Sequence, residues 1–296
     1  MKKITTILIA IIAFFSLNFK SSAQTVQPAE SNALLYKISG KGLQKPSYIY
    51  GTIHIICQND MFGMDKINSY IDQSEQILME LDMDNVTEMQ TMATGAMMTD
   101  GKTLKDLLND EQYSKVDEMF KNIIGISVDT VKTYRPMFLS VMISTSPKSM
   151  GCQTPGSYEL SLLQTAATKK KPIEGLETVA AQFEKISKKS NAEQAKELYE
   201  TALNPQKAID EFKEMIGVYK SQNSENLYKV IDGRLGNPEF QKVMLDERNI
   251  DWIPKIEKAI SKKSTFIAVG GGHLGGENGV INLLRKQGYT VEAIKL

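Results

Sequence analysis

The first strong pattern in the chain is a pair of short segments rich in aromatic and β-branched residues. They cover residues 34–39 and 47–54, and Gly40, Gly42 and Pro46 lie between them. Alternating apolar segments bounded by such turn residues are typical of paired strands. The pattern therefore predicts a β-hairpin at the start of the folded region.

Most of the chain between about residues 84 and 249 follows a different pattern, with apolar residues recurring every three or four positions. This spacing is typical of amphipathic helices. An earlier helix is predicted near residues 64–74, and residues 76–81 resemble a third, buried strand. Within the long helical region, the clearest predicted segments cover residues 103–108, 111–124, 158–169 and 177–186.

Strand character is expected to return only near the end of the chain. Residues 265–269 run into a glycine loop, residues 280–286 form a helix that Gly288 ends, and residues 289–294 close as a strand. The sheet would thus combine strands from both ends of the chain, with a large helical insertion between them. Because neither strand group could bury its faces alone, we expect one α+β domain over residues 34–296.

The leading residues are expected to lie outside that domain. A basic start at residues 1–3 precedes an apolar stretch over residues 4–19, and Ser21-Ser22-Ala23 supplies the small residues that a signal peptidase accepts. We interpret residues 1–23 as a cleaved signal peptide and residues 24–33 as a flexible lead-in, which predicts an exported protein, periplasmic or secreted. An uncleaved anchor is the alternative. No stable membrane insertion is expected after cleavage.

Charge narrows the range of partners. The 296 residues include 35 Lys and Arg against 35 Asp and Glu. No basic cluster with interleaved aromatic residues occurs, so we do not expect nucleic-acid binding.

The two cysteines, Cys57 and Cys152, bear on stability. In an exported protein they meet an oxidising compartment, which favours a disulfide. Two separate buried thiols are the alternative. A bond would brace any site built near Cys57.

The chain has only two histidines, and each follows a glycine by three positions: Gly51 precedes His54, and Gly270 precedes His273. Each histidine falls where a predicted strand runs into a loop, which is where sheets of α/β type present side chains to ligands. The alternative is that each is a hydrogen-bonded core or turn residue. The matched spacing favours a shared site.

Two imidazoles need a further ligand to hold a divalent metal, and a carboxylate is the expected one. Glu80 is the best candidate, because it ends the third predicted strand in an otherwise apolar segment and should lie beside the first hairpin. Asp82 and Asp84 follow closely, but we interpret them as solvated or helix-capping acids.

Two further features have competing interpretations. Gly270-x-Gly272-x-x-Gly275, with Glu292 on the next strand, formally matches a dinucleotide fingerprint. We disfavour that interpretation because His273 would crowd a pyrophosphate. Arg248 could stabilise an oxyanion, but a surface salt bridge to a neighbouring acid is the simpler explanation when the residues are considered alone.

Several ordered motifs together resemble the TraB/GumN family, which is related to the Tiki metalloproteases and more distantly to heme-binding ChaN-like and erythromycin-esterase-like proteins. The resemblance covers nearly the whole chain after the leader. The motifs that carry it are residues 48–54, 80–82, 155–159, 171–178, 247–249 and 269–274. It implies a mixed central sheet built from two related units and wrapped by helices.

The resemblance also implies an activity, namely metal-dependent hydrolysis of a peptide or protein substrate with manganese or cobalt, or with zinc as a further candidate. Carried onto this chain, His54, His273 and Glu80 would be the metal-site residues and Arg248 an electrostatic helper. Glu159 stands where many relatives have Asp. Because Glu80 cannot comfortably be both ligand and base, Glu159 or Glu277 would serve as the base. The alternative is a non-catalytic protein that binds a metal, heme or small ligand on the same fold.

Overall fold

A computed structural model of the protein describes residues 33–235 and 237–296. The predicted signal peptide, and all of the predicted lead-in except Ala33, lie outside the described residues. Within the described part, a six-stranded sheet has the order β6-β4-β7-β2-β1-β8. The strands are β1 (Leu35–Ser39), β2 (Ser47–Thr52), β4 (Gln76–Met79), β6 (Ile173–Gly175), β7 (Thr265–Gly270) and β8 (Thr290–Ile294).

The sheet is mixed, and its direction changes at the hairpin. β6, β4, β7 and β2 are parallel to one another, whereas β1 is antiparallel to both β2 and β8. The hairpin between β1 and β2 confirms the prediction for that segment. Its turn places Gly40, Lys41 and Gly42 at positive φ, the conformation that glycine adopts without steric cost.

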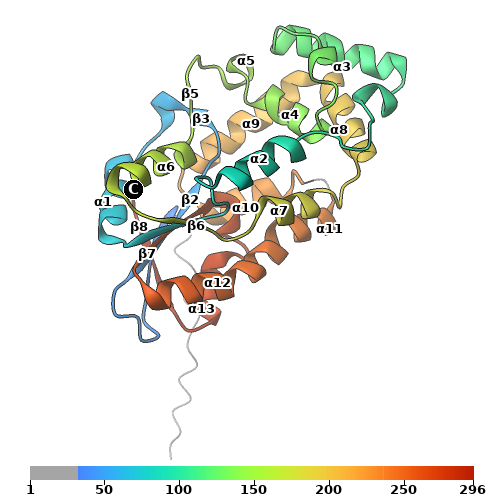
Figure 1. Cartoon of the computed structure of the whole chain (residues 1–296). Helices are drawn as coiled ribbons and strands as arrows, with labels where there is room; N and C mark the ends of the chain where they lie inside the picture. The colour runs from blue at the N-terminus through green and yellow to red at the C-terminus, as the bar shows by residue number, and fades with distance from the viewer. Residues whose placement is uncertain (1–32, 236) are drawn as a thin grey trace, which may run out of the picture.

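Helices cover both faces of the sheet and fill the insertion (Figure 1). Their bounds are α1 (Met64–Gln73), α2 (Val86–Gly95), α3 (Asp110–Ile123), α4 (Pro136–Ser144), α5 (Pro147–Met150), α6 (Tyr158–Lys169), α7 (Val179–Ile186), α8 (Asn191–Leu203), α9 (Pro205–Lys220), α10 (Ser224–Asp232), α11 (Pro238–Gln241), α12 (Arg248–Lys262) and α13 (Val280–Lys286). The helices predicted over residues 158–169 and 280–286 agree with α6 and α13 at both ends. The segment at residues 103–108 instead contains a short 3₁₀ helix, η2 (Leu104–Asp106).

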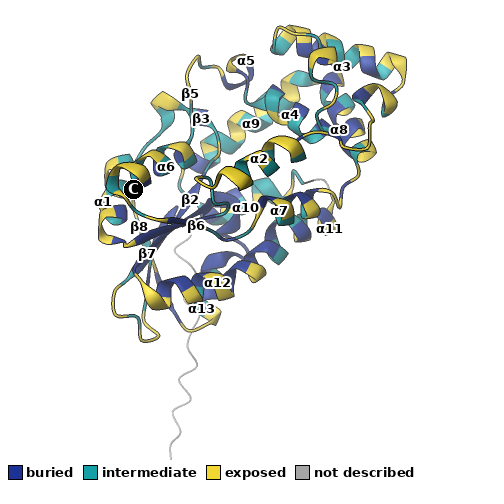
Figure 2. Ribbon diagram, viewed as in Figure 1, coloured by how far each residue is buried: buried dark blue, intermediate teal, exposed yellow. Residues whose placement is uncertain are grey.

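Three of the four apolar clusters in the described residues organise the packing of the sheet and of the insertion. One face of the sheet packs against α12 and α13, and the other against α1 and α6. The strands are therefore covered on both sides, as Figure 2 shows, and every residue of β2 and β4 is buried rather than every second one. Helices α3, α4 and α8 form a separate core within the insertion. The described part of the chain contains no helix long and apolar enough to span a bilayer.

Two predictions about strand placement were wrong. β6 lies inside the region predicted to be helical and joins the edge of the main sheet beside β4. A three-residue strand is too short to show a period, and it is set by its pairing with β4. In addition, β4 does not lie beside the hairpin, because β7 lies between β4 and β2.

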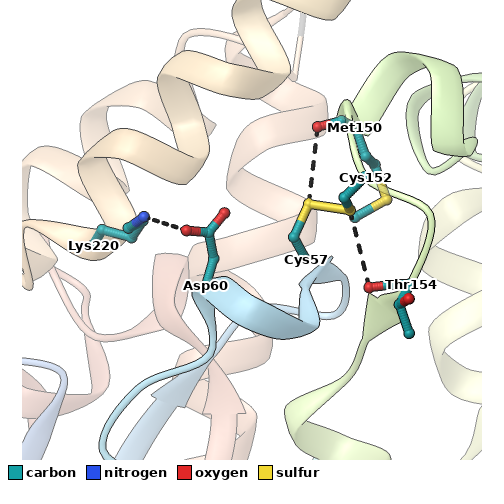
Figure 3. The surroundings of a disulfide bond; sticks show 6 residues. All are labelled: Cys57, Asp60, Met150, Cys152, Thr154 and Lys220. Carbon is teal, nitrogen blue, oxygen red and sulfur yellow. Dashed lines mark hydrogen bonds and ion pairs between the residues drawn. A yellow bond between two sulfur atoms is a disulfide. The ribbon is translucent and has the colours of Figure 1, made fainter.

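A covalent bond ties the start of the chain to the insertion. Cys57 and Cys152 form a disulfide across 95 positions, which confirms the favoured pairing (Figure 3). Beside it, the short strands β3 (Ile56–Cys57) and β5 (Pro155–Gly156) pair antiparallel. Lys220 of α9 forms an ion pair with Asp60 in the same region. The segment that follows His54 is therefore held from two sides.

Candidate functional site

The polar residues of the candidate site gather at the carboxyl ends of the four parallel strands. His54 follows β2, His273 follows β7, Glu80 directly follows β4, and Glu177 follows β6. Since neighbouring parallel strands end at the same edge of a sheet, residues far apart in sequence meet here. The two histidines follow adjacent strands although 219 positions separate them.

Glycine allows the two histidine motifs to pack against each other. A Cβ atom on Gly51 would lie 2.9 Å from the Cα atom of Gly271 and 2.5 Å from a side-chain carbon of Leu274. A Cβ atom on Gly270 would lie 3.2 Å from Oε1 of Glu80. The space that glycine leaves at Gly51 is therefore filled by the second motif, and not by a ligand.

Arg248, at the start of α12, is the centre of the charged network. Its Nη2 atom donates to Oε2 of Glu80 at 2.5 Å, and its Nε and Nη2 atoms donate to Oε1 of Glu177 at 2.9 and 2.6 Å. Only 4% of the Arg248 side chain is exposed. The surface salt bridge considered from the sequence is therefore wrong, and the buried guanidinium is paired with two carboxylates.

Glu80 is held as a carboxylate by its surroundings. Its Oε1 atom accepts a hydrogen bond from the backbone N–H of Gly270 at 2.6 Å. Burial raises the pKa of the carboxyl, but the opposing effect of Arg248 and the two histidines is larger. The net result is a pKa lowered to about 2. Glu80 therefore carries its negative charge at any physiological pH.

His273 is buried against the same network. Its Nδ1 atom lies 2.7 Å from Oδ1 of Asn249, and its Nε2 atom lies 3.1 Å from Nη1 of Arg248 and 3.9 Å from Oε1 of Glu80. The ring contacts Trp252 with 4.6 Å between ring centroids. Burial, together with the nearby charge of Arg248, lowers the pKa of His273 to about 3. The imidazole is therefore neutral.

His54 has a different environment, because 77% of its side chain is exposed. Its Nδ1 atom donates to Oε1 of Glu159 at 2.8 Å. Glu159 also accepts from the hydroxyl of Thr52 at 2.7 Å and from the hydroxyl of Ser157 at 3.0 Å. The hydrogen bond with Glu159 raises the pKa of His54 to about 9. Burial raises the pKa of the Glu159 carboxyl, but the interaction with His54 outweighs this effect, so the pKa is lowered overall.

The donor atoms suit a divalent cation, although they are not gathered around one point. In the part of the chain that the structure describes, no three His, Cys, Asp or Glu side chains are close enough together to hold a metal ion. Arg248 also occupies Nε2 of His273. Each imidazole, however, has Nδ1 held by an outer partner, either Glu159 or Asn249, which is the usual arrangement for a histidine that binds metal through Nε2. The residues therefore fit a cation chemically, and Arg248 would have to release Nε2 for one to bind.

Some sequence candidates lie outside this network. The Glu277 side chain is 89% exposed and approaches Lys286, so it is not placed as the base. Asn85 caps α2, and not Asp82 or Asp84. Burial, with a hydrogen bond involving Asp84, raises the pKa of Asp82 to about 6.

Two residues of the network were missed as site residues, Glu177 and Asn249. Glu177 follows β6 much as Glu80 follows β4, but the signal depended on recognising β6 as a strand. Asn249 directly follows Arg248 in the chain. Its contact with His273 depends on how α12 packs, which no local pattern reveals.

Known proteins share sequence with nearly all of the described residues. A sequence model of the TraB/PrgY/gumN family matches residues 34–293. The chain is 23% identical to Metalloprotease TIKI2 of Xenopus tropicalis over 301 residues, which cover 83% of this chain and 57% of that protein. It is 23% identical to human Metalloprotease TIKI1 over 327 residues, which cover 90% of this chain and 63% of that protein. The chain thus spans less than two thirds of the length of these relatives, and no solved structure matches it. With a match over nearly all of its described residues, the chain belongs to the TraB/PrgY/gumN family.

Proposed function

We propose that this protein is an exported, metal-dependent hydrolase that acts on a peptide or protein substrate. The observation that carries the proposal is the convergence of His273 and Glu80, whose Nε2 and Oε1 atoms lie 3.9 Å apart. They lie at the edge of the sheet where the parallel strands end, and His54 follows one of these strands, β2. The charge of Glu80 affects the pKa of both histidines, which supports a shared site. The metalloprotease relatives support the reaction class.

In this proposal His54, His273 and Glu80 hold a divalent cation, with manganese or cobalt favoured over zinc. When bound, such an ion polarises a scissile carbonyl and lowers the pKa of a water molecule. Arg248 stabilises negative charge that develops on the substrate, because its guanidinium is fixed beside Glu80. Glu159 is bound to Nδ1 of His54, and this contact lowers the pKa of its carboxyl and makes it a weaker base, so its role is to orient His54 rather than to act as the base.

Export is supported by two independent features. Residues 1–23 have the composition of a secretory signal. The disulfide between Cys57 and Cys152 is the kind of bond that persists in an oxidising compartment.

The proposal is tested with purified protein stripped of metal by a chelator and then supplied with manganese, cobalt or zinc. Trp252 is the only tryptophan and its ring contacts His273, so its fluorescence should report cation binding. Incubation with a peptide library should give cleavage that depends on the cation and is lost in His54→Ala and His273→Ala.

Equal cleavage by the wild type and both variants would overturn the proposal. Cation binding, or a heme absorption shift lost in the same variants, without cleavage of any peptide would instead support a non-catalytic binding protein.

A further inference from the structure

The Nε2 atom of His273 has a partner that can play only one role in a hydrogen bond. It lies 3.1 Å from Nη1 of Arg248. A guanidinium nitrogen donates and cannot accept. Nε2 must therefore be the acceptor, so it carries a lone pair and no proton.

The other ring nitrogen is determined by a chain of two contacts. Nδ1 faces the side-chain amide of Asn249 at 2.7 Å, and the far side of that amide lies 2.9 Å from the backbone carbonyl oxygen of Asn278. A carbonyl oxygen only accepts, so the amide nitrogen of Asn249 must face Asn278 and its oxygen must face the ring. Nδ1 of His273 must therefore carry the proton.

We infer that Asn249 is a positioning residue that holds His273 in the neutral Nδ1–H tautomer and leaves the Nε2 lone pair facing Arg248 and Glu80. A free histidine side chain in water prefers the opposite tautomer, so the protein has to impose this one. Asn249 is 0% exposed and His273 is buried, so water is poorly placed to replace either contact.

The support for this arrangement is concentrated in one short segment. Arg248 and Asn249 are consecutive residues at the start of α12, and they contact opposite nitrogens of one imidazole ring. Asp246, two positions before Arg248, accepts a hydrogen bond from the side-chain amide of Asn278 at 3.1 Å. The same segment therefore positions both the ring and the loop that orients Asn249. It follows a π-helical stretch, Lys242–Glu247, a distortion that often occurs at functional sites.

The inference deepens the proposed function, because Nε2 is the atom proposed to hold the cation. The tautomer itself is a property of the metal-free protein, so it can be measured whether or not the protein is an enzyme. The protein has only two histidines, so selective ¹⁵N labelling gives two imidazole spin systems, and His54→Gln identifies the signals of His273.

The primary measurement is a long-range ¹H–¹⁵N correlation spectrum of the wild-type protein at neutral pH with a chelator. We expect His273 to show a protonated Nδ1 and an unprotonated Nε2. A protonated Nε2, whether in the other neutral tautomer or in an imidazolium, would overturn the inference.

The role of Asn249 is tested with Asn249→Leu, in which Nδ1–H loses its acceptor and only Arg248 still favours that tautomer, so a fraction of the Nε2–H form should become detectable. Asn282→Leu is the matched control, because Asn282 also donates to a backbone carbonyl, that of Gly276 at 2.7 Å, and should leave the tautomer unchanged. If Asn249→Leu keeps only the Nδ1–H form, Asn249 does not set the tautomer. Asn249→Asp covers the case in which the leucine variant fails to fold: it keeps an acceptor and should keep the proton on Nδ1, and loss of that proton would contradict the inference.

Manganese titration then links the tautomer to the proposed function. Asn249→Leu should bind manganese about 10- to 100-fold more weakly than the wild type, the usual effect of losing an outer partner of a metal-binding histidine. Unchanged affinity would refute the positioning role. If the wild type binds no cation but shows the Nδ1–H form, the proposed function fails and the inference about the tautomer stands.

Discussion

Oε1 of Glu177 accepts hydrogen bonds from both Nε and Nη2 of Arg248, at 2.9 and 2.6 Å. This contact orients the guanidinium so that its Nη1 atom faces His273 and its Nη2 atom faces Glu80. Glu177 thus fixes the Nε–Nη2 edge of the guanidinium, and it shares Nη2 with Glu80.

The first prediction concerns stability. Glu177→Gln removes one of the two negative charges that offset buried Arg248, so the free energy of unfolding should fall by about 2 kcal/mol, as expected for a buried hydrogen bond to a charged group. Denaturant unfolding measures the change. Glu292→Gln is the control, because Glu292 forms an exposed pair with Lys37 at 3.6 Å and should change stability by less than about 1 kcal/mol. Equal effects of the two substitutions would show that Glu177 does not stabilise Arg248.

The second prediction separates a cation ligand from a residue that orients Arg248. Glu80→Gln should weaken manganese binding by more than about 100-fold, because it removes a proposed ligand, whereas loss of an outer partner alone costs about 10- to 100-fold. Glu177→Gln should leave manganese affinity within about threefold and should instead lower turnover, because Arg248 is less well held. Trp252 fluorescence and peptide cleavage measure the two effects. The assignment of Glu80 fails if both variants bind manganese as tightly as the wild type.

The sequence revealed those parts of the site that depend on local pattern. His54, His273 and Glu80 each end an apolar, strand-like segment, so their placement at strand ends followed from hydrophobicity and glycine spacing. The hairpin, α6 and α13 were predicted for the same reason: each shows its period and its stop signals within its own residues.

The remaining parts depend on contacts between distant segments. β6 is only three residues long and is a strand because it pairs with β4, so Glu177 went unrecognised. Arg248 alone fitted a surface helix equally well, and only the packing of α12 against the strand ends buries it. The insertion of β7 between β2 and β4 is a matter of topology, which hydrophobic periodicity does not encode.

The third prediction is that the stability of the metal-free protein declines on both sides of about pH 6.5, the ordinary pKa of histidine. Burial lowers the pKa of His273 to about 3, so below pH 6.5 the unfolded chain takes up a proton that the native protein does not. The free energy of unfolding should therefore fall by up to about 1.4 kcal/mol per pH unit as the pH drops from 6.5 toward 3. Glu80 adds a further loss as the pH falls from 4.5 toward about 2.

The alkaline side of this profile depends on His54. Its pKa in the native protein is raised to about 9, so its contribution is fully present below pH 6.5 and is lost as the pH rises through 9. Because the ring is largely exposed, this loss should be smaller than the loss on the acid side. Unfolding midpoints measured across pH should show a shallower acid decline in His273→Gln and a shallower alkaline decline in His54→Gln. Identical acid declines in the wild type and in His273→Gln would contradict the neutral, buried state of His273, because the opposing contribution of Asp82, whose pKa is raised to about 6, is the same in both proteins.

The fourth prediction concerns the disulfide, which closes a loop of 95 positions. In the chain-entropy model such a bond contributes up to about 4–5 kcal/mol to the free energy of unfolding. Cys57 lies in β3, which pairs with β5; β3 begins two residues after His54, and β5 ends three residues before Glu159. Loss of the disulfide should therefore both destabilise the protein and loosen the contact between the side chains of His54 and Glu159.

A double variant, Cys57→Ala with Cys152→Ala, tests both effects. It should unfold at lower denaturant than the oxidised wild type and should not respond to dithiothreitol, whereas reduced wild type should resemble it. The pKa of His54, followed by its ¹⁵N signals, should fall from about 9 toward its ordinary value, because the hydrogen bond to Glu159 is its main cause. Lower stability with an unchanged pKa of His54 would mean that β3 and β5 hold the two residues together without the covalent bond, and that the disulfide serves the fold alone.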